Sequence, residues 1–236
     1  MITVLNRMGT FHSDNNGENQ DSVSYGENER FQVISLADGV SSCDEAKCGA
    51  EIASSAITKL FLEKGDFFLS FQEKQVAEYG LSHILYQLGR QAEADSKNVT
   101  EYSSTIASVL VDQKAGKMLC FNLGDGMVLA AGDGKCRVIA LPSDSSEGCC
   151  VTTTKKAETE VFAKVFDLGP TESIVICSDG AWKQMYRKNR LKPEPAYFVG
   201  HSEYARLKGF LEKQDCFDDC SFVALDLRKK GRRKPA

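Results

Sequence analysis

The chain has 236 residues, of which 42% are hydrophobic and 26% are charged, and its formal net charge is −4. This composition is ordinary for a soluble globular protein, and the length fits one domain with a sizeable core. No stretch approaches the roughly 20 apolar residues of a membrane span, and residues 1–7 are too short and mixed for a signal peptide. The nine cysteines are an odd number without a secretory signal, which indicates reduced thiols. We therefore expect a cytoplasmic location.

Basic residues gather at the C-terminal end. Residues 228–236 contain six of the 29 basic residues and no acid, so the body of the chain is more acidic than its net charge indicates. An acidic body is not typical of a nucleic-acid-binding protein, but it suits a protein that collects divalent cations. A basic tail can contact nucleic acid or anionic lipid, although a solvated terminus is the commoner case. We expect a monomer with one domain over residues 1–227, a flexible tail over 228–236, and neither nucleic acid nor membrane as a partner.

The first part of the chain predicts strands and then two helices. Turn-rich pieces separate three runs with strand character, at residues 2–8, 22–25 and 31–36. Beyond them, apolar residues recur at three- and four-residue spacing, which is typical of a helix that begins after Ser42 or Asp44 as the N-cap. A second helix is expected over about residues 70–96.

The remainder predicts mainly strands. Residues 104–111 and 118–123 have the pattern of a hairpin, and two further runs extend it into an antiparallel meander at 128–131 and 136–141. The later strands are expected at 162–166, 174–177 and 221–227, and the later helices at 181–187 and 203–213. This order predicts an α+β fold in which two stacked, mainly antiparallel sheets carry helices on their outer faces.

Acidic residues stand in turns at the ends of the predicted strands. Residues 31–39 form an apolar run that ends on Asp38 and a glycine, and residues 173–180 repeat the pattern and end on Asp179 and a glycine. Such a run reads as a buried strand that delivers a carboxylate to the rim of a sheet. Two acids delivered in this way indicate a metal site.

The full set of acid-bearing turns resembles that of the metal-dependent type 2C serine/threonine protein phosphatases, especially the compact bacterial members. The matching motifs are Asn19-Gln20-Asp21, Ala37-Asp38-Gly39, Gly124-Asp125-Gly126, Ser178-Asp179-Gly180 and Asp218-Asp219-Cys220-Ser221. The resemblance runs in order from about residue 19 to residue 225. It implies a four-layer αββα sandwich that hydrolyses phosphoserine and phosphothreonine in proteins, as a signalling enzyme that acts on the substrates of a Ser/Thr kinase.

The resemblance also implies a role for each acid. Asp38 would bridge two metal ions, and Gly39 would contribute its backbone carbonyl. Asp21 would bind one ion, while Asp179 and Asp218 would bind the other. The neighbouring Asp219 competes with Asp218 for this assignment.

The implied cofactors are two Mn²⁺ or Mg²⁺ ions, which prefer oxygen ligands. Two such ions lower the pKa of a shared water for in-line attack on phosphorus, so no protein nucleophile is expected. Asp125 stands where the family contributes to a third, weaker metal site.

The chain departs from the family pattern where phosphate is held. Asn16 occupies the position of a phosphate-binding arginine, and it supplies hydrogen bonds without charge. Arg7 or Arg30 could substitute from a neighbouring strand. Val40 stands where eukaryotic members place a histidine proposed as a general acid. These departures motivate an alternative, a weakly active or inactive phosphatase fold that binds phosphoproteins as a regulatory module, although retention of four mutually repelling carboxylates favours the enzyme.

Other catalytic classes fit the sequence poorly. A serine hydrolase would need a nucleophile elbow, and no G-x-S-x-G motif is present. No C-x-x-C pair indicates zinc, and no cysteine has an arginine six residues later, as a cysteine-based phosphatase would require.

Overall fold

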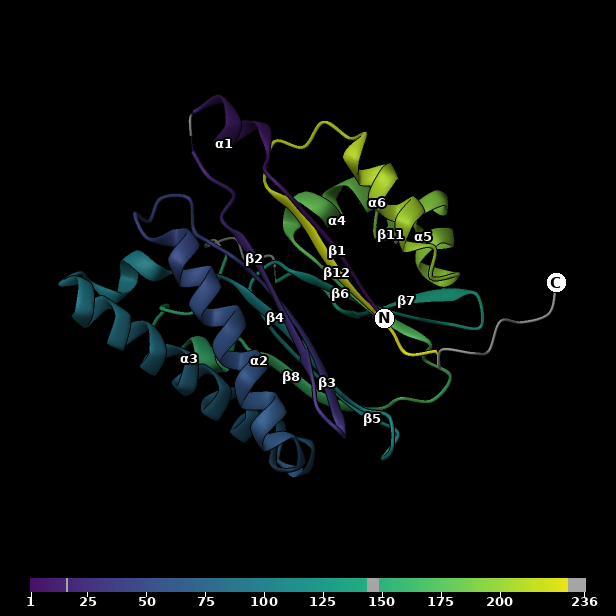
Figure 1. Cartoon of the computed structure of the whole chain (residues 1–236), viewed down its shortest axis with the longest axis horizontal. Helices are drawn as coiled ribbons and strands as arrows, with labels where there is room; N and C mark the ends of the chain where they lie inside the picture. The colour runs from purple at the N-terminus through teal and green to yellow at the C-terminus, as the bar shows by residue number, and fades with distance from the viewer. Residues whose placement is uncertain (16, 144–148, 229–236) are drawn as a thin grey trace.

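Two five-stranded sheets lie face to face in the computed structural model, which describes residues 1–15, 17–143 and 149–228 (Figure 1). The first sheet has the order β2-β3-β4-β5-β8, and each neighbouring pair is antiparallel. Its strands are β2 (Asp21–Glu27), β3 (Phe31–Asp38), β4 (Ile106–Asp112), β5 (Lys117–Leu123) and β8 (Phe162–Asp167).

The second sheet joins the two ends of the described chain. Its order is β1-β12-β9-β6-β7, again with antiparallel neighbours throughout. Its strands are β1 (Ile2–Arg7), β6 (Met127–Gly132), β7 (Lys135–Ala140), β9 (Ser173–Cys177) and β12 (Cys220–Asp226).

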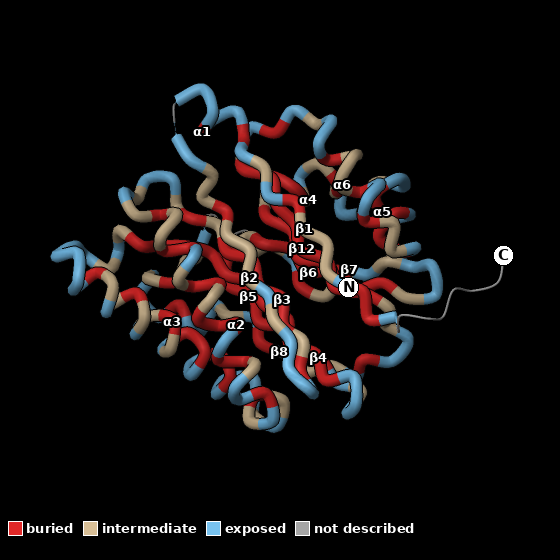
Figure 2. The backbone as a smooth tube through the Cα atoms, viewed as in Figure 1, coloured by how far each residue is buried: buried red, intermediate tan, exposed pale blue. Residues whose placement is uncertain are grey.

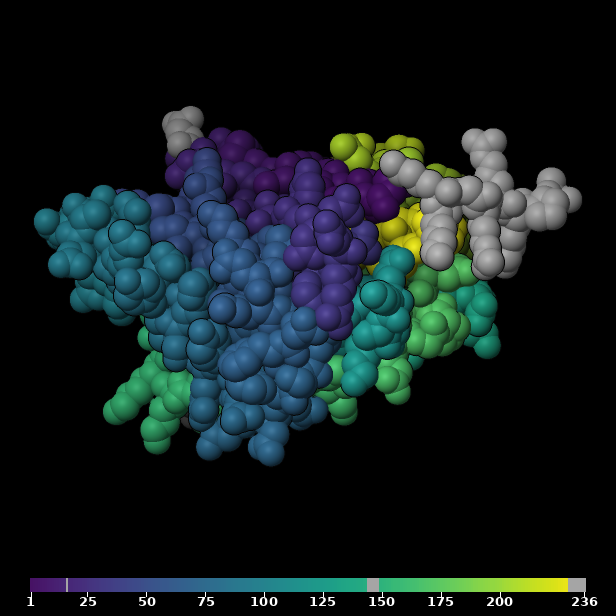
Figure 3. Space-filling model, turned by 60° about the horizontal axis from the view of Figure 1, so that its bottom comes forward, coloured from purple at the N-terminus to yellow at the C-terminus, as the bar shows by residue number. Residues whose placement is uncertain are grey.

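Helices cover the outer face of each sheet. The long helices α2 (Ala46–Ser70) and α3 (Glu73–Asp95) pack on the first sheet and form a broad surface of the molecule (Figure 3). Three shorter helices pack on the second sheet: α4 (Asp179–Met185), α5 (Pro193–Gly200) and α6 (Tyr204–Glu212). The predicted α+β, four-layer αββα arrangement is therefore confirmed.

Three apolar layers hold the sandwich together. Buried residues run along the central strands, while exposed residues lie mainly on the outer helices and loops (Figure 2). Successive residues of a strand point to opposite faces, so the continuous apolar run of β3 serves two layers at once. Val33 belongs to the layer under α2 and α3, whereas Ile34 belongs to the layer between the sheets, where Ile176 and Val223 of the second sheet also lie.

Short elements were not predicted from the sequence. They are α1 (Thr10–Asp14), η1 (Val99–Tyr102), η2 (Ala157–Thr159), β10 (Tyr186–Arg187) and β11 (Arg190–Leu191), together with α5. The predicted N-caps Ser42 and Asp44 were also wrong, because α2 begins after Glu45. The Glu45 N–H donates to the carbonyl of Glu101, so contact with a distant segment fixes this helix start.

The predicted single meander was wrong as well. The hairpin β4-β5 belongs to the first sheet, and the hairpin β6-β7 belongs to the second. The chain changes sheets at Gly124, whose φ of 100° is a conformation that favours glycine. Residue alternation alone does not reveal this change of sheet.

Several predictions concern the two ends of the chain and its cysteine thiols. All nine cysteines lie in the described part and are free. Residues 229–236 of the predicted tail lie outside the described residues, and Arg228 pairs with Asp226 at 2.6 Å. Among the described residues, no helix combines the length and apolarity needed to cross a bilayer.

Candidate active site

Two acids meet where β2 begins and β3 ends. The antiparallel register pairs Asp21, the first residue of β2, directly with Asp38, the last residue of β3. Side chains of directly opposed residues lie on the same face of a sheet, so the two carboxylates are neighbours. Thr105 fixes this strand end, because its N–H donates to the Asp38 carbonyl at 2.8 Å and its hydroxyl accepts from the Asp38 N–H at 3.1 Å.

Gly39 follows at a crowded position. Its N–H donates to the carbonyl of Gln20 at 3.2 Å, and it forms an isolated bridge with Ser104. A Cβ at this position would lie 2.6 Å from the carbonyl oxygen of Ala46, so a larger residue would displace the start of α2. The glycine therefore lets the strand end approach this helix closely.

The second sheet brings its acids to the same edge. Asp179 is the first residue of α4 and follows β9, while Asp218 and Asp219 come just before β12. Trp182 of α4 donates from Nε1 to the Asp125 carbonyl at 2.7 Å, which links this helix to the turn between β5 and β6. The predicted acids thus converge from five strand ends.

A cavity of about 150 Å³ lies between these acids. It is lined by His12, Asp38, Gly39, Val40, Ser41, Thr105, Asp125, Cys149, Val151, Asp179, Asp218 and Asp219. Asp21 lies beside it, opposite Asp38, and is only 4% exposed. The structure therefore brings together Asp21, Asp38, Gly39, Asp125, Asp179 and Asp218, the residues predicted as the metal set.

The carboxylate of Asp21 is buried without compensation. Neither of its oxygens has a hydrogen-bond partner among the described residues. Burial raises its pKa to about 7, and the nearby charges of Asp219 and Asp179 add to the rise. The nearby hydroxyls of Ser221 and Ser178 lower the pKa of Asp21 in part. Neither donates its hydrogen bond to Asp21, because Ser221 donates to Asn6 Oδ1 and Ser178 donates to the Asp219 carbonyl.

The neighbouring acids share this environment. Burial raises the pKa of Asp38 well above its usual range, and the carboxylates of Asp21, Asp179 and Asp125 add to the effect. Burial, followed by the charge of Asp179, also raises the pKa of Asp125. Charge repulsion among buried acids is relieved by protonation or by a bound cation.

The donor set fits divalent cations. Asp179 Oδ1 is buried without a partner within the described residues, as are both oxygens of Asp21. Hard cations prefer carboxylate and carbonyl oxygens of this kind. In the part of the chain that the structure describes, however, no group of three or more His, Cys, Asp and Glu side chains is already arranged to hold an ion.

Asp219 differs from its neighbour Asp218. Its carboxylate accepts hydrogen bonds from Gly9 N at 2.8 Å, from Gln20 N at 2.7 Å and from His12 Nδ1 at 2.9 Å. These three bonds hold the segment before β2 against the start of β12. They favour Asp218, whose side chain is 41% exposed, as the more available ligand of the two.

His12 was missed in the sequence as a residue of this site. The carboxylate of Asp219 accepts from two backbone N–H groups, and the Nδ1 atom of His12 lies 2.9 Å from its Oδ2. The opposite nitrogen, Nε2, is buried without a partner among the described residues, and the residue lines the cavity. No local sequence signal pairs these two residues, which are 207 positions apart.

Lys183 was also missed, although its spacing could have revealed it. It lies four residues after Asp179 on α4, and its Nζ is 2.6 Å from Asp179 Oδ2 and 3.1 Å from Asp218 Oδ2. Partial burial lowers the pKa of its ammonium, but the bonds with these two acids outweigh that effect and raise the pKa above its usual range. The ammonium therefore stays charged between the two acids.

Neither of the two arginines suggested as phosphate ligands lines the cavity. Arg7 donates to the carbonyls of Glu212 and Gln214, and Arg30 pairs with Asp66 and with a second acid, Asp112, so neither lines the cavity. The suggestion that either arginine substitutes for the missing one is therefore wrong.

Two other predicted positions have different outcomes. Asn16, predicted to contact substrate, lies outside the described residues. Val40 lines the cavity, as its place beside Asp38 and Gly39 predicts.

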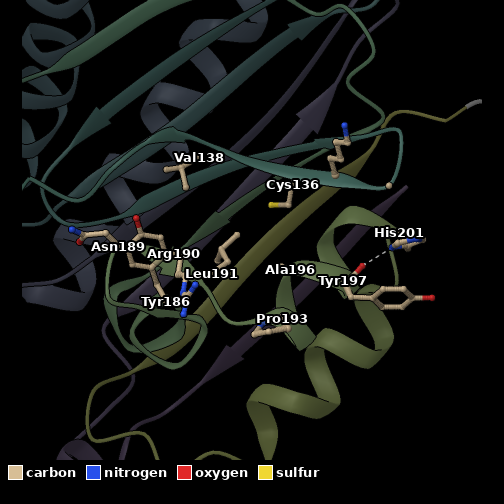
Figure 4. A pocket seen from close by; sticks show the side chains of 12 residues that line it. Cys136, Val138, Tyr186, Asn189, Arg190, Leu191, Pro193, Ala196, Tyr197 and His201 are labelled. Carbon is tan, nitrogen blue, oxygen red and sulfur yellow. Dashed lines mark hydrogen bonds between the residues drawn. The ribbon is translucent and has the colours of Figure 1, made fainter.

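A larger cavity, of about 530 Å³, lies between β7, the β10-β11 hairpin and α5 (Figure 4). Its lining includes Cys136, Tyr186, Leu191 and Tyr197, and His201 bonds to the Tyr197 carbonyl at 2.9 Å. Its lining residues include no carboxylate, so it lacks the ligands that a hard cation needs. The smaller, acidic cavity is the candidate active site.

A family match covers most of the chain. Residues 8–214 match the family described as "Protein phosphatase 2C". No curated protein sequence matches the chain.

Solved structures of similar fold include two serine/threonine phosphatases and RsbX. An S. agalactiae serine/threonine phosphatase has a TM-score of 0.69 and 15% identity, and the match covers 97% of this chain and 99% of that one. The serine/threonine phosphatase Stp1 from Staphylococcus aureus has a TM-score of 0.65 and 16% identity, with 96% and 94% covered. RsbX in complex with magnesium has a TM-score of 0.56 and 13% identity, with 94% and 92% covered.

Proposed function

Because this chain belongs to the protein phosphatase 2C family and is thus a protein serine/threonine phosphatase, we propose that divalent cations support its hydrolysis of phosphoserine and phosphothreonine in proteins. One observation carries the metal dependence. The carboxylate of Asp21 is buried beside that of Asp38, and its two oxygens have no partner among the described residues. An ionised pair of this kind is stable only when a cation lies beside it.

The proposed ligands follow from the arrangement of the cavity. Asp38 would serve both cations. Asp21 and the Gly39 carbonyl would hold one of them, and Asp179 and Asp218 would hold the other. When bound, such cations lower the pKa of water for attack on phosphorus and screen the phosphoryl charge.

Other groups shape the cavity for substrate. Asp125 would contribute to a third, weaker cation site. The bonds from Gly9, Gln20 and His12 to Asp219 hold the cavity wall in place. With Val40 beside Asp38, the wall is partly apolar where the serine or threonine ester would enter.

The cofactor and the biological setting are parts of the same proposal. RsbX, a protein of similar fold, is in complex with magnesium, which supports Mg²⁺ or Mn²⁺ here. The S. agalactiae and Staphylococcus aureus proteins are named serine/threonine phosphatases, which supports phosphoproteins as substrates. We propose that this monomeric, cytoplasmic enzyme reverses phosphorylation by a Ser/Thr kinase in a signalling pathway.

A second candidate is a phosphoprotein-binding regulatory module of low activity. It is favoured by the orientation of Arg7 and Arg30, neither of which reaches the cavity. Without an arginine guanidinium to donate two hydrogen bonds to it, a phosphate dianion is bound more weakly.

Hydrolysis of an aryl phosphate and a phosphothreonine peptide, with Mn²⁺ or with a chelator, tests the proposal. We expect Mn²⁺-dependent turnover that falls by about a thousandfold in Asp38→Asn and in Asp179→Asn, because each change removes a carboxylate ligand. The matched control is Asp133→Asn, the same change at an exposed turn. Turnover that survives the chelator or the Asp38 change would refute metal-dependent catalysis, and phosphopeptide binding without turnover would favour the regulatory module.

A further inference from the structure

Lys183 stands where two of the proposed metal ligands meet. Its ammonium nitrogen lies 2.6 Å from Asp179 Oδ2 and 3.1 Å from Asp218 Oδ2. Asp179 belongs to the same helix, whereas Asp218 comes from the loop before β12. One lysine thus bridges acids from two separate segments, as a cation between them would.

The fold fixes the base of this side chain. Residues four apart lie on the same face of a helix, so Lys183 and Asp179 face the same side of α4. Ala181 and Met185 anchor α4 in the core, and Trp182 bonds to the turn that carries Asp125. The lysine therefore starts from a constrained position at the rim of the acidic cavity.

The acids on the opposite side have no such partner. Both oxygens of Asp21 are buried without a hydrogen bond among the described residues. These two unpartnered oxygens point to a missing cation, and they belong to neither of the carboxylates that the ammonium holds. The site is thus divided into an open part and a part closed by lysine.

We propose that Lys183 is a tethered competitor of the second divalent cation. This inference rests on the proposed function, because it assumes that Asp179 and Asp218 can bind metal. An ammonium group and a divalent ion repel each other at contact distance and cannot share the same two oxygens. The ammonium of Lys183 therefore opposes binding of the second cation until the lysine has moved aside, although Oδ1 of Asp179 has no hydrogen-bond partner among the described residues. The first cation binds beside Asp21 and Asp38 without that step.

This division makes the enzyme sensitive to metal supply. The first position fills at low concentrations of Mn²⁺ or Mg²⁺, and the second fills only at higher concentrations. If both ions are needed for turnover, the lysine sets the metal concentration at which the phosphatase becomes active.

Direct Mn²⁺ binding to the full chain tests the inference, with electron paramagnetic resonance of free Mn²⁺ as the readout. We expect wild type to bind one ion tightly and a second at least about tenfold more weakly. In Lys183→Met, the second site should tighten by at least about tenfold, because its tethered competitor is gone. Lys183→Arg keeps the charge and should bind like wild type.

The matched control is Lys208→Met on α6. Lys208 forms an i,i+4 pair with Glu212, and its side chain is exposed to nearly the same extent as that of Lys183. Circular dichroism checks the fold, and Lys183→Gln provides a second neutral variant.

The outcomes separate the two proposals. Equal second-site affinity in wild type, Lys183→Met and Lys183→Gln would overturn the tethered competitor, while the metal-dependent phosphatase would stand. A chain that binds no Mn²⁺ in any variant would overturn both. A gain in affinity confined to the neutral variants at position 183 supports the inference.

Discussion

The two sides of the acidic cavity satisfy their carboxylates in opposite ways. On the side of β2 and β3, Asp21 is 4% exposed and has no hydrogen-bond partner among the described residues. On the side of α4 and β12, Asp219 is 3% exposed and accepts three hydrogen bonds. On the same side, Lys183 forms ion pairs with Asp179 and Asp218. Two equally buried carboxylates therefore differ in hydrogen bonding, because Asp219 has three donors and Asp21 has none among the described residues.

The difference distinguishes acids that stabilise the fold from acids that need a ligand. A buried carboxylate with several donors favours its ionised form and stabilises the protein. One without donors favours protonation, and its ionisation costs stability until a cation binds. The side of β2 and β3 is therefore complete only in the metal-loaded protein.

The largest expected effect is a gain of stability in metal-free Asp21→Asn. The folded-state pKa of Asp21 is raised from 3.8 to about 7, so its ionisation destabilises the fold progressively as the pH rises between these values. We expect the variant to have a free energy of unfolding higher by on the order of 3 kcal/mol at pH 8, with the difference vanishing towards pH 4. Urea unfolding with a chelator at both pH values measures it.

A control variant and a measurement with Mn²⁺ accompany this test. Asp133→Asn, an exposed change of the same kind, should leave the free energy of unfolding unchanged at both pH values. Excess Mn²⁺ at pH 8 should stabilise wild type more than Asp21→Asn, because the variant lacks one anionic ligand. If the variant were less stable than wild type at pH 8, ionisation of Asp21 would not destabilise the metal-free protein, contrary to the prediction.

An intermediate effect of the opposite sign is expected for Asp219→Ala. The change leaves the N–H groups of Gly9 and Gln20 and the imidazole of His12 without their shared acceptor. We expect a loss of about 2 kcal/mol at pH 7, with or without metal, in thermal or urea unfolding. Asp218→Ala is the matched control, and an equal loss in that variant would show that the two neighbours have the same structural role.

The smallest effect on stability is expected for Lys183→Met in the metal-free protein. Both Lys183 and Asp218 are more than 40% exposed, and solvent screens their pair. We expect the free energy of unfolding at pH 7 to fall by less than about 1 kcal/mol in physiological salt, and by less at high salt. A loss of several kcal/mol in a urea titration would show that the lysine is mainly a structural residue.

The acids of the site could be predicted because their signals are local. Asp38 and Asp179 each follow an apolar run and precede a glycine, and both lie at strand ends in the fold. The strands and long helices likewise follow from apolar periodicity over short windows. The layered architecture followed from the order of these elements.

What could not be predicted depends on contacts between distant segments. His12 meets Asp219 across 207 positions, and the start of α2 depends on the segment that carries Glu101. The change of sheet at Gly124 depends on the pairing of β6 with β7 and with the later strand β9, which a short window of sequence does not record. Lys183 was the exception, because its i,i+4 relation to Asp179 is local, but its second partner, Asp218, is not.

The pairing of β1 with β12 has a consequence for how the enzyme is made in the cell. Ile2 lies opposite Leu225, so β1 leaves the ribosome long before β12, the strand with which it pairs. Asp218 also arrives just before β12, and a nascent chain that has reached only β9 lacks one wall of the cavity. Translation therefore delivers the phosphatase site late, and products that stop before β12 should be catalytically silent.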